Sequence, residues 1–359
     1  EVAREYRFKR GSGLPLRIPV IEMVEVGAGG GSICGLDGLG NIYVGPQSAG
    51  SEPGPACYGK GGKLATVTDA NLILGRIDHE IFADGKIDLL PNAASVSLKQ
   101  NISQRLGVSE RVGAMGVVEM VDENMANAAR EHAVERGKSP EGRTMIAFGG
   151  SAPLHAARLA EKLGVEKIII PTGAGVGSAI GFLHAPITYE ITRSLYQRLS
   201  TFEIRKVSSL LQKLETDASK VVLRAAGKTP LRVRRSAYMR FVGQRHEIKV
   251  SLPKGMIDEK KVGAIKTNFS EAYRIQYSRT MPDVDIEIVG WSVSVSAHTE
   301  SLESRNSRFR KKKIKSMQTT KIWDFSSEKP VYYFVYLREE VPNGSIIAGP
   351  SIIAEPQTT

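Results

Sequence analysis

A glycine-dense stretch over residues 27–59 constrains the fold of this chain more than any other feature of its sequence. It contains two runs, residues 27–33 and residues 44–59, in which glycines and prolines are interleaved with small hydroxyl residues. Such a backbone loses much conformational entropy on folding and brings few side chains to a core. Its main-chain N–H groups can approach an anion closely. The stretch predicts either a ligand-binding loop or a glycine-rich structural junction, although neither run matches a standard phosphate motif.

Apolar strands alternate with helices in the first half of the chain. Residues 144–148 and 167–171 predict short buried strands, and a helix that begins at Pro153 separates them. A longer helix is predicted over residues 111–136, because apolar residues recur there at helical spacing. The order strand–helix–strand, with fully apolar strands, indicates an α/β sheet.

The pattern changes after residue 190. One amphipathic helix is predicted over residues 201–226, and from Leu231 onward several segments alternate hydrophobic and polar residues with a period of two. That period predicts a mostly antiparallel β region, interrupted by a flexible loop over residues 305–320. We therefore predict two domains, residues 1–190 and residues 191–359.

The charge balance is basic, with 49 Lys and Arg residues against 38 Asp and Glu residues and a formal net charge of +11. The densest basic runs are residues 232–235 and 308–315, which predict solvated loops and strand faces. A nucleic-acid partner is not expected, because no aromatic-rich platform or recognition helix accompanies the charge. An acidic partner surface or an anionic substrate fits the excess equally well.

Cys34 and Cys57 are the only cysteines, and both lie in the glycine-dense stretch. They form no Cys-x-x-Cys pair, so they predict buried free thiols, with a thiol near a site as the alternative. No apolar run is long enough to span a membrane, and no signal-peptide pattern is present. We therefore expect a cytoplasmic protein with no membrane partner, or, because the sequence begins at Glu1 rather than at methionine, a piece of one.

A strand-to-helix junction is the first segment with chemical content. Residues 148–156 place Gly149, Gly150 and Ser151 at the start of the helix that contains Pro153. Helix N-termini carry free N–H groups and partial positive charge, and glycine lets a ring or a phosphate lie against the backbone. The junction predicts either a nucleotide site or a tight structural turn.

Polar residues of two helices form the other candidates. Asp69 either orients a water or a metal ion or, like Thr68, caps the helix that begins near Thr66. Asn127, Arg130 and Glu131 share one face of the long helix, where a solvated surface is the simplest interpretation. The six histidines are scattered without metal-ligand spacing, so the metal ligands stay unknown.

Several segments, taken in order, resemble the hydantoinase A/5-oxoprolinase family. The matching segments are residues 27–33, 45–50, 53–59, 67–72, 134–137 and 147–156. The resemblance implies an actin-like, sugar-kinase-type ATPase fold, in which residues 1–190 form the second half of the ATPase domain. It also implies an enzyme that uses ATP to phosphorylate a carbonyl oxygen. Hydantoinases and oxoprolinases then open a cyclic amide, whereas the related acetone and acetophenone carboxylases activate a ketone and bicarbonate.

Site roles follow from this resemblance. Ser32 and Asp69 are the predicted catalytic residues, with Asp69 orienting polar groups and the N–H groups before Ser32 stabilising negative charge. The predicted ATP-binding residues are Gly29, Gly30, Gly31, Gly149, Gly150 and Ser151. Cyclic-amide opening and ketone carboxylation are nearly equal alternatives, and a segment near residue 180 resembles the carboxylase branch.

The family's two Asp-x-Gly-Gly-Thr phosphate motifs do not occur in these 359 residues. The ligands of Mg²⁺ are therefore expected outside these 359 residues, either on a partner chain that carries those motifs or on an upstream part of a longer protein. A hydantoinase B-type subunit and a small-molecule carbonyl substrate are the other expected partners. The competing hypothesis is a non-catalytic structural or regulatory half-subunit that completes a nucleotide cleft with a partner.

Overall fold

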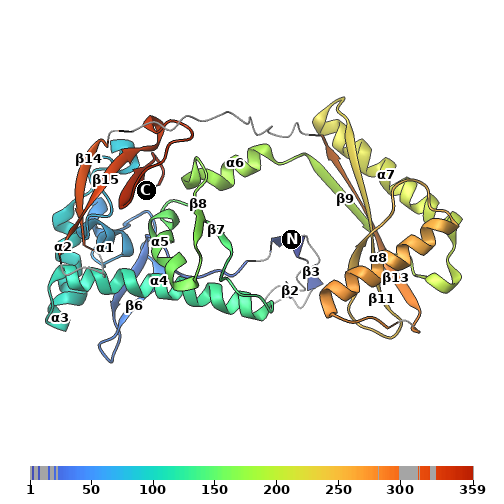
Figure 1. The fold of residues 1–359 in the computed structure, drawn as a ribbon, viewed down its shortest axis with the longest axis horizontal. Helices are drawn as coiled ribbons and strands as arrows, with labels where there is room; N and C mark the ends of the chain where they lie inside the picture. The colour runs from blue at the N-terminus through green and yellow to red at the C-terminus, as the bar shows by residue number, and fades with distance from the viewer. Residues whose placement is uncertain are drawn as a thin grey trace. The chain divides into compact units, whose positions relative to one another are not determined.

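The computed structural model describes residues 23–281, 283–298, 314, 316–323 and 329–358, together with four two-residue strands nearer the N-terminus. Those short strands pair as two ladders: β1 (Val2–Ala3) with β4 (Val20–Ile21), and β2 (Arg7–Phe8) with β3 (Pro15–Leu16). The chain forms two compact units (Figure 1). The first unit comprises Glu1–Ile180 and Ser307–Thr359, and the second comprises Gly181–Asn306.

The first unit begins with the predicted hairpin. Strands β5 (Ser32–Leu36) and β6 (Ile42–Ser48) are antiparallel. Asp37 shapes the turn between them, because its Oδ1 accepts hydrogen bonds from the N–H groups of Leu39 and Asn41, both at 2.8 Å. A side chain that bonds to its own turn in this way is a common device for reversing the chain.

Helices build the core against this hairpin. They are α1 (Val67–Ile73), α2 (Pro91–Leu98), a π-helical segment (Lys99–Ser103), α3 (Gln104–Leu106) and α4 (Glu110–Glu135). The long helix predicted over residues 111–136 is confirmed as α4. Buried apolar side chains on its inner face pack with those of the other helices: Val67, Leu74, Leu98, Ile102, Val117, Val118 and Val121.

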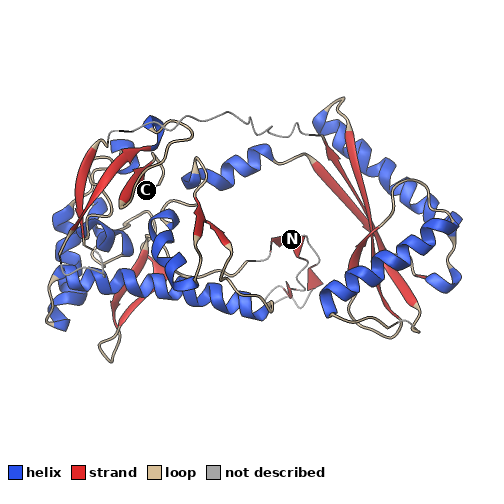
Figure 2. Cartoon of the chain, viewed as in Figure 1, coloured by secondary structure: helices blue, strands red, loops and turns tan. Residues whose placement is uncertain are grey.

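A βαβ unit follows α4 (Figure 2). Strand β7 (Thr144–Ile146) pairs in parallel with β8 (Lys167–Ile169), and α5 (Ala152–Leu163) connects them. The predicted α/β order is confirmed, but the prediction that both strands are buried is wrong. Ile146 is 59% exposed and Ile169 is 43% exposed, because α5 covers only one face of the pair. The short helix α6 (Gly177–His184) comes after β8.

Three C-terminal strands belong to the first unit. Strand β15 (Val331–Leu337) pairs antiparallel with β14 (Gln318–Ile322) and parallel with β16 (Ser351–Ala354). After β14, the N–H of Trp323 donates to the carbonyl oxygen of Leu74, at 3.2 Å. These contacts explain why the compact units differ from the predicted division at residue 190. Most of the predicted loop over residues 305–320, with the basic run 308–315, lies outside the described residues; residues 318–320 belong to β14.

The second unit is a five-stranded antiparallel sheet with two long helices. Strand β13 (Ile286–Ala297) pairs with β9 (Thr188–Arg193), β10 (Gln197–Arg198) and β11 (Leu231–Phe241), and β11 also pairs with β12 (Ile248–Ser251). Helix α7 (Ile204–Ala226) contacts β13, and α8 (Glu259–Tyr277) contacts β12. The antiparallel character was predicted for this region, whereas α8 was not.

Within the described residues, no helix is both long and apolar enough to cross a bilayer.

Candidate functional site

The first glycine run is held on the first turn of α1. The Gly29 N–H donates to Ser32 Oγ at 3.0 Å, and that hydroxyl donates to the Gly27 carbonyl oxygen at 3.2 Å. The Gly30 carbonyl oxygen accepts from both the N–H and the hydroxyl of Thr68, each at 2.8 Å. The hydroxyl of Ser32 therefore closes the turn of this loop, and its predicted catalytic role stays a prediction.

The two glycine runs touch each other at Gly27 and Gly45. A Cβ atom on Gly27 would lie 2.5 Å from the Pro46 Cα, and one on Gly45 would overlap the Gly27 carbonyl oxygen. Gly45 also has a φ of +69°, which disfavours any side chain. At these two positions the stretch is a structural junction. Around Gly29, by contrast, nothing lies within 4 Å of an added Cβ.

The structure brings the two predicted nucleotide-binding segments together. A Cβ added to Gly30 would lie 3.6 Å from Ser151 Oγ, although the two residues are far apart in sequence. Ser151 precedes the first residue of α5, and no side chain caps that end of the helix. In the described part of the chain, the N–H groups of Gly30, Gly31, Gly150 and Ser151 have no acceptor. Unpaired N–H donors on two neighbouring segments are suited to an anionic ligand.

The C-terminal residues complete the surroundings of Gly149 and Gly150. The Thr358 hydroxyl lies 3.1 Å from the carbonyl oxygen of Gly149 and 2.9 Å from that of Gly150. Glu355 Oε2 accepts from the Gly173 N–H at 3.2 Å, after β8. Thr358 and Glu355 were not predicted as site residues, and no local sequence signal points to them, because the contact depends on how the C-terminal strands pack.

Asp69 is fully buried, and its carboxylate is occupied by neighbouring groups. One oxygen accepts from the N–H of Cys57 at 2.8 Å. The other accepts from the N–H groups of Ala56 at 3.2 Å and Thr66 at 2.9 Å, and from the Thr66 hydroxyl at 2.8 Å. Thr66 is the N-cap of α1, so the predicted caps at Thr68 and Asp69 are replaced by a capping box between Thr66 and Asp69. This geometry gives Asp69 a structural part, and a catalytic role for it stays a prediction.

Both cysteines are buried free thiols, as predicted. Burial raises the pKa of Cys34 and of Cys57, and the Asp69 carboxylate raises both further. Each thiol is therefore held protonated near neutral pH. Because the thiolate is the reactive form, neither cysteine is suited to act as a nucleophile.

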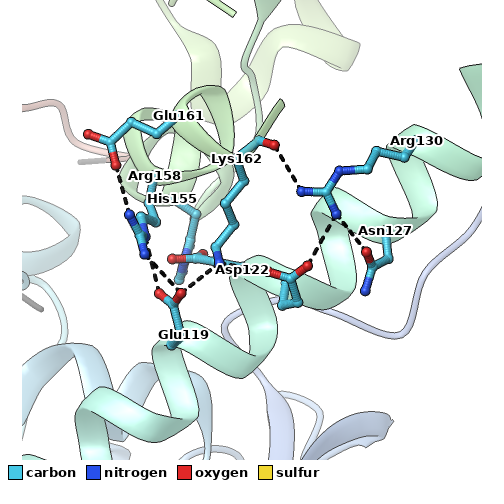
Figure 3. Close-up of polar contacts among 9 residues, drawn as sticks. Glu119, Asp122, Asn127, Arg130, His155, Arg158, Glu161 and Lys162 are labelled. Atoms are coloured by element: carbon cyan, nitrogen blue, oxygen red, sulfur yellow. Dashed lines mark hydrogen bonds and ion pairs between the residues drawn. The ribbon is translucent and has the colours of Figure 1, made fainter. Parts of the chain in front are cut away.

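A buried polar network, formed by Asn71, Asp122 and His155, joins helices α1, α4 and α5. His155 Nδ1 on α5 lies 2.7 Å from Asp122 Oδ1 on α4 (Figure 3), and His155 Nε2 lies 3.3 Å from Asn71 Nδ2 on α1. All three residues are at most 1% exposed. The arrangement fits a neutral imidazole that donates from Nδ1 to the carboxylate and accepts from the amide at Nε2. Because Gly30 is bonded to Thr68 on α1 and Ser151 directly precedes α5, this polar network links the two helices that carry the glycine segments.

Asp122 was not predicted as a site residue. Two atoms of this polar network have no hydrogen-bonding partner among the described residues. Asp122 Oδ2 and Asn71 Oδ1 are buried without a hydrogen bond in the described structure. In the sequence, Asp122 sits beside Glu123 and has the pattern of an ordinary acidic residue on a helix surface. Only its contact with His155 distinguishes it.

A cluster of charged residues connects α5 to α4 near this polar network (Figure 3). Glu119 accepts from Arg158 Nη2 at 2.9 Å and from Lys162 Nζ at 2.6 Å, and Lys162 also reaches Glu123 at 2.7 Å. Arg130 donates to Asn127 Oδ1 at 2.7 Å and to the Lys162 carbonyl oxygen at 2.8 Å. The face of α4 that was predicted to be a solvated surface therefore contacts α5 in part, through Arg130.

The ionisation of Glu119 is expected to make this contact sensitive to acid. The hydrogen bond from Arg158 holds the pKa of Glu119 below its ordinary value of 4.5. Its contribution to stability is therefore complete above the unfolded pKa and is lost as the pH falls through the lower, folded pKa. The melting temperatures of the wild type and Glu119→Gln, measured at neutral and at acidic pH, should differ at neutral pH and converge in acid. A difference that does not change with pH would contradict this.

No group of three or more His, Cys, Asp or Glu side chains gathers as a metal site within the described residues. The Asp69 carboxylate, the buried acid nearest the glycine segments in sequence, is already saturated by hydrogen bonds. The described residues therefore suit the binding of an anion through N–H groups better than the direct binding of a cation.

Two curated proteins and one solved structure are similar to this chain. Caprolactamase subunit alpha of Pseudomonas jessenii is 34% identical over 288 residues, which are 79% of this chain and 41% of that protein. The crystal structure of the ATP-dependent caprolactamase matches 96% of this chain and 51% of its own, with a TM-score of 0.76 and 31% identity. The gamma subunit of acetophenone carboxylase from Aromatoleum aromaticum is 38% identical over 167 residues, 46% of this chain and 22% of that subunit.

A nucleotide-free structure of acetone carboxylase matches over the same share, 96% of this chain and 51% of its own, with a TM-score of 0.80 and 24% identity. These superpositions confirm the predicted α/β fold class of a sugar-kinase-like ATPase. The chain spans about half the length of the curated relatives it matches. The sequence profile described as hydantoinase/oxoprolinase matches residues 1–191, more than half of the chain. The chain is therefore a member of the hydantoinase/oxoprolinase family.

Proposed function

We propose that this chain is part of an ATP-dependent enzyme that activates a carbonyl group by phosphorylating its oxygen. The observation that carries the proposal is the meeting of Gly30 with Ser151, which gathers N–H donors from two loops at one place. ATP supplies the phosphoryl group, and the loops would hold its negative charge. Free N–H groups at the start of a helix favour such charge without a cationic side chain.

Opening of a cyclic amide is the reaction we favour. It is supported by the match to caprolactamase, which extends over 79% of this chain. In this reaction the amide oxygen attacks the terminal phosphorus of ATP and ADP leaves. A first water adds to the activated carbon, and the ring C–N bond breaks to give a free amine and an acyl phosphate. A second water then attacks the acyl carbon, and phosphate departs with the original amide oxygen, so that both oxygens of the new carboxylate come from water. The products are an amino acid, ADP and phosphate, and N–H groups near the reacting oxygen would stabilise the developing charge.

Carboxylation of a ketone is the second candidate. It is supported by the match to the acetophenone carboxylase gamma subunit, which has the higher identity, 38%, over a shorter segment. Labelled bicarbonate separates the two reactions when the complete assembly is incubated with ATP and each carbonyl compound. Label in an acid product supports carboxylation, and its absence together with a ring-opened product supports amide hydrolysis.

A non-catalytic half-subunit remains the competing proposal, because the side chains of Ser32 and Asp69 are both engaged in the chain's own hydrogen bonds. In either case we propose that the Mg²⁺ ligands and the Asp-x-Gly-Gly-Thr motifs come from a partner chain, alongside a hydantoinase B-type subunit. If the isolated chain binds ATP with no dependence on Mg²⁺, the non-catalytic proposal gains.

Substituting two glycines tests whether the loop takes part. An added Cβ at Gly30 would meet Thr68 Oγ1 at 2.8 Å, whereas one at Gly38, in the turn between β5 and β6, meets nothing within 4 Å. Gly30→Ala should turn the Thr68 side chain away and shift the loop against Ser151, which we expect to weaken ATP turnover ~10-fold or more. Gly38→Ala is the control, because Gly38 lies outside the predicted site, and it should keep most activity. Equal turnover in both variants would remove the loop from the site.

A further inference from the structure

The four residues after β16 form a closed turn, residues 355–358. The Glu355 N–H donates to the Thr358 carbonyl oxygen at 2.8 Å, and the Thr358 N–H donates to the Glu355 carbonyl oxygen at 3.3 Å. The turn packs closely on the loop after β8, because a Cβ added to Gly175 would overlap the Gln357 carbonyl oxygen. The Glu355 side chain and Thr358 are each only 7% exposed. The turn is therefore fixed against the first unit.

The Thr358 hydroxyl orients two successive peptide groups. It lies within hydrogen-bonding distance of the carbonyl oxygens of both Gly149 and Gly150, at 3.1 Å and 2.9 Å. The peptide bonds from Gly149 to Gly150 and from Gly150 to Ser151 are trans, and in a planar trans peptide group the N–H points opposite to the C=O. The N–H groups of Gly150 and Ser151 therefore both point away from Thr358.

These two N–H groups are among those that have no acceptor in the described part of the chain. Along an extended strand successive N–H groups alternate in direction, whereas here two neighbours lie on the same side. Gly149 has a φ of +124°, a value that glycine adopts more readily than other residues, and it takes part in this change of direction. Successive N–H groups on one side form a small concave donor site that suits an anion.

Glu355, at the other end of the turn, holds the loop after β8. Its Oε2 accepts from the Gly173 N–H at 3.2 Å, and its Oε1 lies 3.8 Å from Arg338 Nη1. In that loop the Ala174 carbonyl oxygen accepts from the Gly149 N–H at 2.8 Å. The turn therefore reaches Gly149 by a second route, through the loop after β8.

We propose that the turn 355–358 positions the glycine segment for nucleotide binding, and that Thr358 is the positioning residue that aims the N–H groups of Gly150 and Ser151 at a phosphate group of ATP. The inference rests on the proposed function, since it takes ATP as the ligand. Thr358 acts through the two peptide groups and does not itself touch the ligand. Without the hydroxyl, these peptide groups would be free to rotate, and the two donors would no longer be preorganised before ATP binds.

Steady-state kinetics of the complete assembly test this role, because a binding defect and a folding defect change different constants. Thr358→Val removes the hydroxyl but keeps the shape of the side chain, and it should raise the KM for ATP ~10-fold or more with little change in kcat. A variant that only folds less well provides less active enzyme, so its apparent kcat falls and its KM stays. Thr358→Ser keeps the hydroxyl and should have the wild-type KM. Thr319→Val is the matched control, since Thr319 is exposed on β14.

Glu355 provides a second pair of variants. Glu355→Ala removes the acceptor of the Gly173 N–H and should also raise the KM for ATP, whereas Glu355→Gln keeps an oxygen that can accept and should be milder. The proposal is overturned if Thr358→Val keeps the wild-type KM, or if Thr358→Ser is as impaired as Thr358→Val. If Thr358→Val does not assemble, a wild-type KM in Glu355→Ala overturns it. A wild-type assembly that forms no ADP from ATP would instead overturn the proposed function.

Discussion

Replacing Asp69 with alanine is expected to destabilise the first unit severely, whatever the chain catalyses. The carboxylate accepts four hydrogen bonds at a site with no solvent exposure, three of them from backbone N–H groups. A buried donor left without an acceptor costs ~1–3 kcal/mol. The variant should therefore lose roughly 3 kcal/mol or more of unfolding free energy. Because the chain has two units, amide exchange at Ala56, Cys57 and Thr66 is a better measurement than a single global unfolding curve.

A second substitution at the same position distinguishes a structural role of Asp69 from a catalytic one. Asp69→Asn preserves shape but turns an NH₂ group toward N–H donors, so it should also be destabilised, although less than the alanine variant. Asp88→Ala is the control, since Asp88 is exposed in a neighbouring loop, and it should exchange as the wild type does. An asparagine variant with wild-type protection that has lost turnover would show that the predicted catalytic role is right.

Replacing His155 with alanine should have the second largest effect. The change leaves the Asp122 carboxylate buried with its hydrogen-bonding partner removed. Breaking a buried, charge-bearing pair on one side costs ~3–5 kcal/mol, and the missing ring adds a cavity. We expect Asp122→Asn to be milder, because its amide oxygen can still accept from His155 Nδ1. Urea denaturation followed by hydrogen exchange at amides of α1, α4 and α5, which report on the first unit alone, checks the order of the variants.

His79→Ala is the control for this comparison, because the His79 side chain is 54% exposed. It should unfold at the same urea concentration as the wild type. If His155→Ala also unfolds at the urea concentration of the wild type, the polar network does not hold α1 and α5 together. The position of Gly30 beside Ser151 then needs another explanation.

Local signals explain which elements could be predicted. The β5–β6 hairpin has Asp37 and nearby glycines at its turn, and α4 has apolar residues at helical spacing, so both were found from the sequence. Helix α8 also has local signals, an N-cap at Asp258 and the buried residues Ile265, Phe269 and Tyr273. They were missed because the flanking strands, with their period of two, dominated the interpretation of that region.

Long-range packing explains the errors. A fully apolar strand predicts burial on both faces only if both neighbouring layers are present, and the exposed Ile146 has no such layer in the described residues. The pairing of β15 with β16 is parallel, which no local pattern distinguishes from antiparallel pairing. The same holds for Thr358, which reaches Gly149 only because the C-terminal strands fold back onto the first unit.

Spacing along the sequence predicts both glycine segments as candidate binding loops, and the structure places Gly30 close to Ser151. That these segments bind ATP stays a prediction. The sequence did not reveal that the side chains of Ser32 and Asp69 are engaged internally, because a side chain that caps a turn and one that binds a ligand have the same residue type. Distance and burial separate these possibilities, and neither can be obtained from spacing along the chain.

The most direct test of the proposed function is ADP formation by the complete assembly, with caprolactam, 5-oxoproline, hydantoin, acetone and acetophenone offered singly and the ketones supplied with bicarbonate. The account predicts that one class of carbonyl compound stimulates ADP formation, that Gly30→Ala removes the stimulation, and that Gly38→Ala retains it. ADP formation that no carbonyl compound stimulates, or that Gly30→Ala leaves unchanged, would contradict the account.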